Sequence, residues 1–390
     1  MSKNLSILNY GQTKVVFGRN SILEVIFEMK RLSITKPLIV TDNELYQNNI
    51  LAPLIEILER ENIAFILFDK VSPDPTSSLV DIGVSVLKEH ACDGVIGIGG
   101  GSVMDCAKCI AAMATNPGIL LDYDHANKDY HNFVHNILPL INIPTTSGTG
   151  SEVSPYAVIT NEKEHRKATI GSPLLISNVA ILDPIFVDHL PKKATASTGM
   201  DALTHCIEAY TSINSLNNPN PIVDALALKG IELIFHGLPL AYKECDCVAR
   251  ENVLWGSLIG GIVLQYGSGA SHGLGNVLGG SLHVPHGVAV GMLLPHVIAF
   301  NYDACEERYK AIAEVMHLTE KKEDTKDNIK NALQNLLTEM QFPVLKDYCN
   351  DLDMIEKLSY LAVKDKCTRI NAKQIKKDDA FDIYKNAMKR

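Results

Sequence analysis

Short apolar runs alternate with amphipathic segments over the first 188 residues, and this alternation constrains the fold more than any other feature. The strand-like runs are 14–18, 37–42, 63–68, 94–99 and 138–143. Segments with helical periodicity lie between them, at 21–31, 52–61, 77–90 and 102–114, and Asn20 is predicted to cap the first. Because parallel strands need crossover connections, the pattern predicts a mainly parallel sheet with helices on both faces.

The pattern becomes helical after about residue 188. Segments 194–212, 221–242 and 250–265 have helical periodicity, and strand-like runs are nearly absent beyond residue 191. The sequence therefore predicts an α/β domain over residues 1–188 and an all-α domain over residues 189–390.

Composition narrows the function classes. Of the 390 residues 46% are hydrophobic and 21% charged, as is usual for a soluble globular protein. A net charge of -9 argues against nucleic acid and anionic membranes as partners. We expect no membrane span, since no apolar run approaches the roughly 20 residues one needs. The N-terminus has no signal-peptide core, and the nine cysteines are interpreted as free thiols, so a cytoplasmic location is expected.

A glycine-rich stretch, residues 97–102, follows a predicted strand and precedes a predicted helix. Glycines let the backbone approach an anion closely, and the helix N-terminus adds free N–H groups and a positive dipole end. Ser102 stands where the dinucleotide fingerprint G-x-G-x-x-G has its last glycine. A phosphate-binding loop is favoured here over a simple tight turn.

A second loop, residues 144–152, also follows a strand and is rich in hydroxyl groups and glycine. It can wrap the pyrophosphate or the nicotinamide side of a dinucleotide, or it can be a Ser/Thr turn that caps its own backbone. Two such loops at the carboxyl ends of strands favour ligand binding. Asp42 ends another strand, where a carboxylate either binds the adenosine ribose and repels a 2′-phosphate or caps the next helix.

A candidate metal site begins with Asp201 and His205, which lie on one face of a helix because they are four residues apart. Such a pair is ordinarily a surface contact. The segment 269–287, however, carries His272, His283 and His286 among small residues. Three imidazoles and one carboxylate suit Fe²⁺ or Zn²⁺, and an open coordination position would make the site catalytic.

Taken together, these motifs resemble those of the iron-dependent (group III) alcohol dehydrogenase family, over nearly the whole chain. The resemblance implies a dinucleotide-binding domain followed by a helical metal-binding domain. It assigns the metal to Asp201, His205, His272 and His286. It assigns cofactor contacts to Asp42, Gly99, Gly100, Gly101, Ser102, Asp105, Thr145, Thr146, Thr149 and Lys167.

The sequence departs from the family pattern at one position. Many members have a histidine four residues after the third metal ligand, where this chain has Asn276. His283, three residues before His286, can take over a proton-path role or can be a surface residue that only supports the site.

The predicted function is a metal-dependent, NAD(H)-linked alcohol dehydrogenase that interconverts a small alcohol and its aldehyde or ketone, with Fe²⁺ favoured over Zn²⁺ and NAD over NADP. A homodimer or larger homo-oligomer is expected from the resemblance. The alternatives are a glycerol dehydrogenase-like enzyme, a dehydroquinate synthase-like enzyme, and a non-catalytic metal- or nucleotide-binding module. Few Lys and Arg lie near the metal motifs, which disfavours the anionic substrate of the synthase.

Overall fold

The computed structural model describes residues 13–164, 166–318 and 324–389. The N-terminal residues on which the cytoplasmic expectation rests lie outside these ranges. The chain forms two compact units, each with its own core. The first unit contains the described residues up to Thr146 together with Gly150–Leu190. The second unit contains Ser147–Thr149 and the described residues from Pro191 onward.

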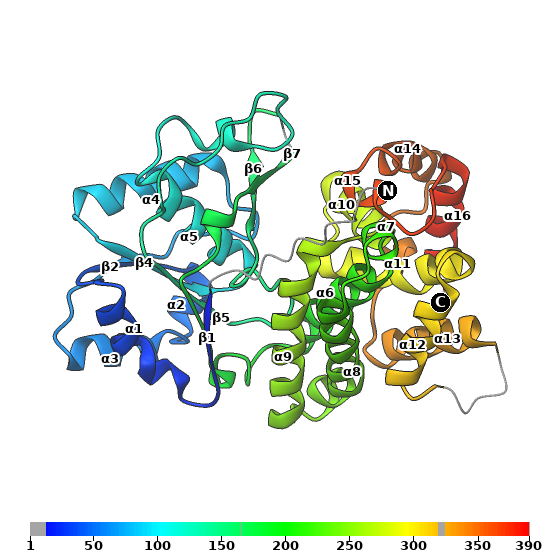
Figure 1. Ribbon diagram of the computed structural model, residues 1–390, viewed down its shortest axis with the longest axis horizontal. Coiled ribbons are helices and arrows are strands. Elements are labelled where there is room, and N and C mark those ends of the chain that lie inside the picture. Colours follow the sequence, from blue (N-terminus) through cyan, green and yellow to red (C-terminus); the bar gives the residue numbers. More distant parts are fainter. Residues whose placement is uncertain (1–12, 165, 319–323, 390) are drawn as a thin grey trace, which may run out of the picture. The chain divides into compact units, whose positions relative to one another are not determined.

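The first unit is built on a six-stranded parallel sheet with the strand order β1-β8-β5-β4-β2-β3 (Figure 1). The strands are β1 (Lys14–Phe17), β2 (Pro37–Val40), β3 (Ile66–Phe68), β4 (Gly94–Gly99), β5 (Leu140–Pro144) and β8 (Val179–Leu182). The helices are α1 (Val25–Arg31), α2 (Asn43–Gln47), α3 (Ala52–Arg60), α4 (Ser77–Glu89) and α5 (Gly101–Met113). The predicted parallel sheet is confirmed.

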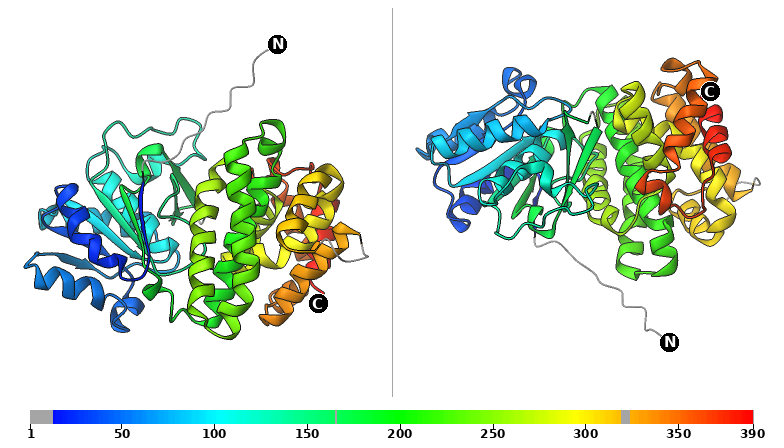
Figure 2. Two further views of the ribbon diagram at one scale, coloured as in Figure 1. Left: turned by 60° about the horizontal axis from the view of Figure 1, so that its bottom comes forward. Right: turned by 90° about the horizontal axis from the view of Figure 1, so that it is seen from above.

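Both faces of this sheet are buried, which explains the continuous apolar runs of its strands. Neighbouring residues of one strand point to opposite faces, so Leu38 packs with α4 and α5 while Ile39 packs with α1 and α3. Figure 2 shows the two helical layers on either side of the strands.

Three strands of this unit were not predicted. β6 (Tyr156–Asn161) and β7 (Arg166–Gly171) form a separate antiparallel hairpin, in which buried and more exposed residues alternate. β8 was missed because it is a four-residue run close to the predicted domain boundary.

The prediction that Asn20 caps the first helix was wrong. Asn20 has a left-handed backbone (φ 64°) and no side-chain cap. Asp183 takes the capping role from another part of the chain, because its carboxylate accepts the N–H groups of Asn20 and Ile22 at 3.1 and 3.0 Å. The segment then begins as a short 3₁₀ helix, Ser21–Glu24, before α1.

The second unit is helical, as predicted. Its helices are α6 (Lys192–Thr211), α7 (Ile213–Asn217), α8 (Pro221–Lys243), α9 (Cys247–Val263), α10 (Ala270–Leu282), α11 (His286–Asn301), α12 (Glu306–Val315), α13 (Thr325–Glu339), α14 (Leu352–Ala362), α15 (Lys366–Arg369) and α16 (Lys377–Ala387). Helix α6 packs against α8, α9 and α11. Every residue from Gly199 to Thr211 is buried, so α6 is the core helix of this unit.

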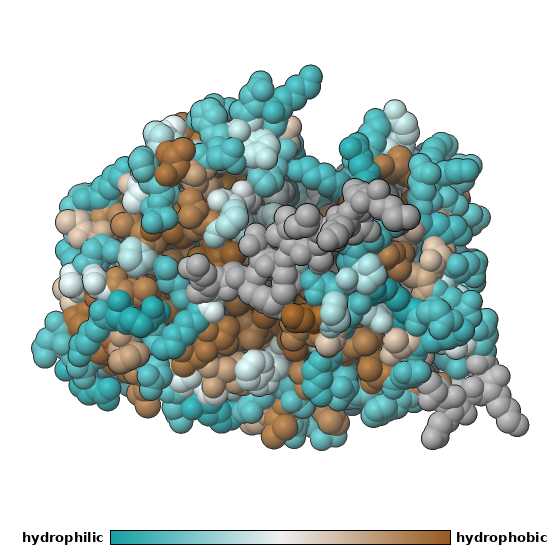
Figure 3. Space-filling view, viewed as in Figure 1, coloured by the Kyte–Doolittle hydropathy of each residue, from teal (hydrophilic) through white to brown (hydrophobic). Residues whose placement is uncertain are grey.

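The structure corrects the expectation that no apolar run is long enough to span a membrane. Cys247–Tyr266 is long and apolar enough to cross a membrane by length and composition, with a mean hydropathy of 1.3. Most of it is buried, however, and α9 packs against α6 and α8, which is how a core helix of a soluble protein behaves. On the face drawn in Figure 3, hydrophilic residues cover most of the surface formed by the C-terminal helices.

Candidate functional site

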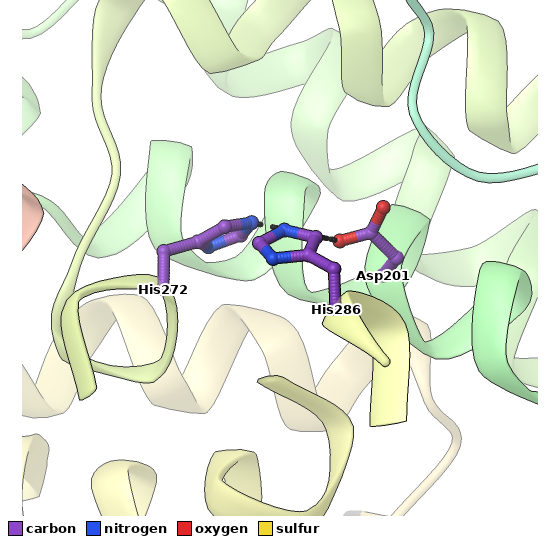
Figure 4. A group of neighbouring side chains, drawn as sticks. All are labelled: Asp201, His272 and His286. Atoms are coloured by element: carbon purple, nitrogen blue, oxygen red, sulfur yellow. Dashed lines mark ion pairs between the residues drawn. The ribbon is translucent and has the colours of Figure 1, made fainter. Parts of the chain in front are cut away.

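Four predicted metal ligands come from three helices of the second unit. Asp201 and His205 lie one turn apart in the buried part of α6, His272 lies in the first turn of α10, and His286 is the first residue of α11. The turn between α10 and α11 sets the position of His286, because His283 ends α10 with a left-handed backbone (φ 54°) and Pro285 precedes α11. Figure 4 shows three of these side chains pointing toward one another.

The ligand atoms converge on one oxygen of Asp201. From Asp201 Oδ1 the distances to His286 Nε2, His272 Nε2 and His205 Nε2 are 3.4, 3.6 and 3.9 Å. Ligands about 2.1 Å from a common centre, placed tetrahedrally, lie about 3.4 Å apart. Asp201, His272 and His286 form a group whose ligand atoms are all within 4.8 Å of one another. His205 lies beside this group, with its ring stacked on that of His272 at 4.7 Å.

Burial makes this arrangement costly unless a cation completes it. Asp201 and His272 are 3% and 6% exposed, and neither Asp201 Oδ1 nor His272 Nε2 has a hydrogen-bond partner among the described residues. A buried polar atom without a partner costs about 1–3 kcal/mol. Although burial raises the pKa of Asp201, the imidazoles of His205, His286 and His272 outweigh it and hold that pKa below its usual range. These residues fit a divalent cation.

Glu208 is a residue of this site that the sequence analysis missed. Its carboxylate accepts from the backbone N–H of Ser271 and lies 2.7 Å from Nδ1 of His272, so Nε2 of that ring faces the site. Burial by itself raises the pKa of Glu208, but the bonds to His272 and Ser271 have the larger combined effect. The pKa of Glu208 is therefore below its usual value. Glu208 is seven residues after Asp201 and three after His205, so the helical spacing could have revealed it.

The two remaining residues singled out near this site lie on α10. Asn276, one turn after His272, is exposed, and its side-chain amide donates to Asp365 Oδ2 at 3.3 Å. His283 is also exposed, at the C-terminus of the helix.

The predicted glycine loop lies where β4 ends and α5 begins, with Gly100 as the N-cap. A Cβ at Gly99 would lie 2.6 Å from Val103 Cγ2, so packing of the loop on its own helix requires this glycine. A Cβ at Gly100 would lie 3.5 Å from the nearest atom, in Thr146, which is an ordinary contact. Packing therefore does not explain Gly100, and the close approach of a ligand to its backbone stays a prediction.

The second loop follows β5, and its threonines differ in their surroundings. Thr145 is buried, and its N–H donates to the carbonyl of Gly99 at 3.0 Å, which joins the two loops. Thr146 and Thr149 are partly exposed. Ser147–Thr149 belong to the second unit. A Cβ at Gly148 would lie 2.6 Å from Thr198, so this part of the loop packs closely against α6.

The other predicted cofactor residues have protein partners. Asp42 caps α2, accepting the N–H of Leu45 at 2.8 Å. Ser102 donates to the carbonyl of Pro73, and Lys167 pairs with Asp74. Asp105 accepts hydrogen bonds from Ser151, at the end of the second loop, and from Val158 beyond it. The contacts of all of these residues with a dinucleotide stay predictions.

Glu152, at the end of the second loop, is expected to make stability fall as the pH rises. It is 1% exposed, and burial raises its pKa from 4.5 to about 7. Between these pH values the unfolded chain releases a proton that the folded chain keeps, which costs the folded state about 3 kcal/mol by pH 8. We expect Glu152→Gln to remove this loss, measured as the change in unfolding free energy between pH 4.5 and pH 8 in urea.

The matched control for this experiment is Glu89→Gln, because Glu89 is an exposed acid at the end of α4. Its pH profile should follow that of the unmodified protein. An unchanged slope in Glu152→Gln would mean that Glu152 is ionised in the folded state.

Comparisons with known proteins match both parts of the chain to one family. The model of iron-containing alcohol dehydrogenases matches residues 12–184, and that of the C-terminal part of the same family matches residues 195–388. The chain is 36% identical to choline dehydrogenase of Bacillus subtilis, covering 96% of this chain and 93% of the relative. It is 38% identical to alcohol dehydrogenase 4 of Saccharomyces cerevisiae, covering 95% and 96%.

A solved structure of a 1,3-propanediol oxidoreductase has the same fold, with a TM-score of 0.91 and 31% identity over 98% of this chain and 100% of that one. The family models match both halves of the chain, and the relatives align along nearly its full length. The chain therefore belongs to the iron-containing alcohol dehydrogenase family and is an alcohol oxidoreductase.

Proposed function

We propose that this enzyme interconverts a small alcohol and its aldehyde or ketone, with NAD(H) as hydride carrier and a divalent metal bound by Asp201, His205, His272 and His286. One observation carries the proposal. Two buried ligand atoms, Asp201 Oδ1 and His272 Nε2, lie 3.6 Å apart without hydrogen-bond partners and beside a third ligand from another helix.

The ligand set and the family favour Fe²⁺, with Zn²⁺ as the other candidate. When bound, the metal acts as a Lewis acid toward the oxygen of the alcohol or carbonyl. Asp201 contributes the only negative charge among the four ligands, so the bound metal keeps a net positive charge toward substrate. Glu208 holds the ring of His272 with Nε2 toward the site.

The cofactor in this proposal is NAD rather than NADP. The pyrophosphate-binding loop is formed or supported by Gly99, Gly100, Gly101, Ser102 and Asp105. The nicotinamide side is formed by Thr145, Thr146, Thr149 and Lys167. The carboxylate of Asp42 disfavours a 2′-phosphate by charge repulsion. Because a bound NAD would supply the hydride acceptor, no side chain of the protein needs to be a nucleophile.

His283 is the candidate proton-path residue. It is exposed at the end of α10, three residues before His286, so solvent reaches its imidazole. Asn276 cannot take this role, because an amide side chain does not titrate. We also propose that the enzyme is cytoplasmic and acts as a homodimer or larger homo-oligomer.

The proposal is tested by reconstituting the apoprotein with Fe²⁺, Zn²⁺, Mn²⁺ or Co²⁺ and following NADH oxidation with a panel of carbonyl compounds. The names of the relatives supply the panel, which contains formaldehyde, lactaldehyde, betaine aldehyde and 3-hydroxypropanal. We expect metal-dependent oxidation of NADH with at least one of them, and a lower rate with NADPH.

Each result has a defined meaning. Turnover that is independent of added metal, in protein shown to be metal-free, would exclude the role proposed for the four ligands. A complete lack of turnover with every pair of metal and carbonyl compound would contradict the dehydrogenase proposal.

A further inference from the structure

Lys108 is the least expected residue of the first unit, since its side chain is fully buried in α5. Its ammonium group donates to Ser151 Oγ at 2.8 Å, to the carbonyl of Ser154 at 3.0 Å and to the carbonyl of Tyr156 at 2.8 Å. A lysine has three N–H donors. Each donor therefore has an acceptor in the segment 151–156, which begins at the end of the second loop.

Asp105, one turn earlier on α5, holds the same segment from the same face of the helix. Its Oδ1 accepts from Ser151 Oγ at 2.5 Å, and its Oδ2 accepts from the N–H of Val158 at 2.8 Å. Lys108 Nζ lies 3.8 Å from Asp105 Oδ1, so the two charges offset each other. Ser151 donates to the acid and accepts from the lysine, which fixes the direction of its hydroxyl.

These contacts connect the two segments on which the proposed dinucleotide site rests. Helix α5 begins at the glycine loop, and residues 151–158 comprise the end of the second loop and the chain that follows it. The strands that lead into the two loops also pair, up to Gly99 and Pro144, and the Thr145 N–H donates to the carbonyl of Gly99. The buried pair Asp105–Lys108 therefore sets the spacing of the loops on the side where the second loop ends.

A buried lysine is an expensive way to hold two segments together. An ion pair removed from water is frequently no more stabilising than apolar residues of the same size, while it fixes one arrangement of its partners. Burial alone lowers the pKa of Lys108, and Asp105 and Glu152 oppose this shift. Geometric specificity is the property that Lys108 supplies and that an apolar residue would not.

We infer that Lys108 is a positioning residue for dinucleotide binding, which holds the end of the second loop, from Ser151 onward, at a fixed distance from the glycine loop without touching the cofactor. The inference rests on the proposed function. It predicts that ligands that span both loops depend on Lys108 more strongly than ligands that contact the glycine loop alone.

The test compares NADH with ADP in Lys108→Met, because ADP has the pyrophosphate but lacks the nicotinamide riboside. We expect the Kd for NADH, measured by fluorescence, to rise at least about tenfold, since binding to a loosened site must restore the order that was lost. The Kd for ADP, measured by calorimetry, should change less than threefold, and the Kd for Zn²⁺ at the second unit should not change.

Lys88→Met is the matched control, because Lys88 is an exposed lysine on the neighbouring helix α4. Should Lys108→Met fail to fold, Ser151→Ala removes the shared hydroxyl but keeps the ammonium group, and it should raise the NADH Kd about threefold or more while leaving ADP unaffected. Equal losses for NADH and ADP, or no loss for either, would overturn the inference. If the unmodified enzyme itself bound no NADH, the proposed function would fail together with it.

Discussion

Alanine in place of His272 is expected to abolish tight metal binding and to lower turnover about 10³-fold. The substitution removes one of three ligands whose atoms lie within 4.8 Å of one another. It also leaves the carboxylate of Glu208 buried without its imidazole partner. A Lewis-acid metal contributes several kcal/mol to catalysis, and each 1.4 kcal/mol corresponds to about a factor of ten in rate.

The measurement is metal per chain by elemental analysis after dialysis, together with kcat for NADH oxidation. His236→Ala serves as the control, because His236 is an exposed histidine of α8 in the same helical unit. It should keep the full metal content and turnover. If His272→Ala retained both, the ligand set proposed above would be wrong.

Glutamine in place of Glu208 is expected to weaken metal binding about 10- to 100-fold, although Glu208 itself is not a proposed ligand. The neutral amide still fits beside His272 Nδ1 but no longer carries the negative charge that makes the ring a stronger ligand. It also weakens the bond to the N–H of Ser271, which helps to hold the first turn of α10.

The Kd for Zn²⁺, obtained by competition with a chelator at pH 7, checks this expectation. Glu232→Gln is the control, since Glu232 is a partly exposed acid that pairs with Lys229 on the surface of α8. A Kd for Glu208→Gln within threefold of that of the unmodified enzyme would show that Glu208 only supports the packing of α6 against α10.

Local periodicity was sufficient to predict much of the fold and part of the site. Asp201 and His205 are one turn apart, so their shared face follows from helix geometry. The assignment of His272 and His286 as ligands came from the family pattern. The position of His286 depends on a turn with a left-handed residue that periodicity does not reveal. Glu208 shared the periodicity of Asp201 and was visible in principle.

Long-range contacts were beyond prediction from local pattern. The hydrogen-bond acceptors of Lys108 are more than forty residues away along the chain. The apolar residues near Lys108, such as Ala107 and Ile110, indicate that it is buried but not which groups its ammonium meets. The same holds for Asp183, which replaced Asn20 as the cap across more than 160 residues. In both cases the partners of a buried polar side chain are groups that only the folded chain brings near.

The four candidate ligands also differ in how easily solvent reaches them. The side chains of Asp201, His205 and His272 are less than one-tenth exposed, whereas that of His286 is 47% exposed and is attached to the first residue of a helix. If these residues hold a metal as proposed, we expect the exposed ligand, His286, to dissociate first and to govern how fast the metal enters and leaves. The three buried ligands would then govern how tightly it binds.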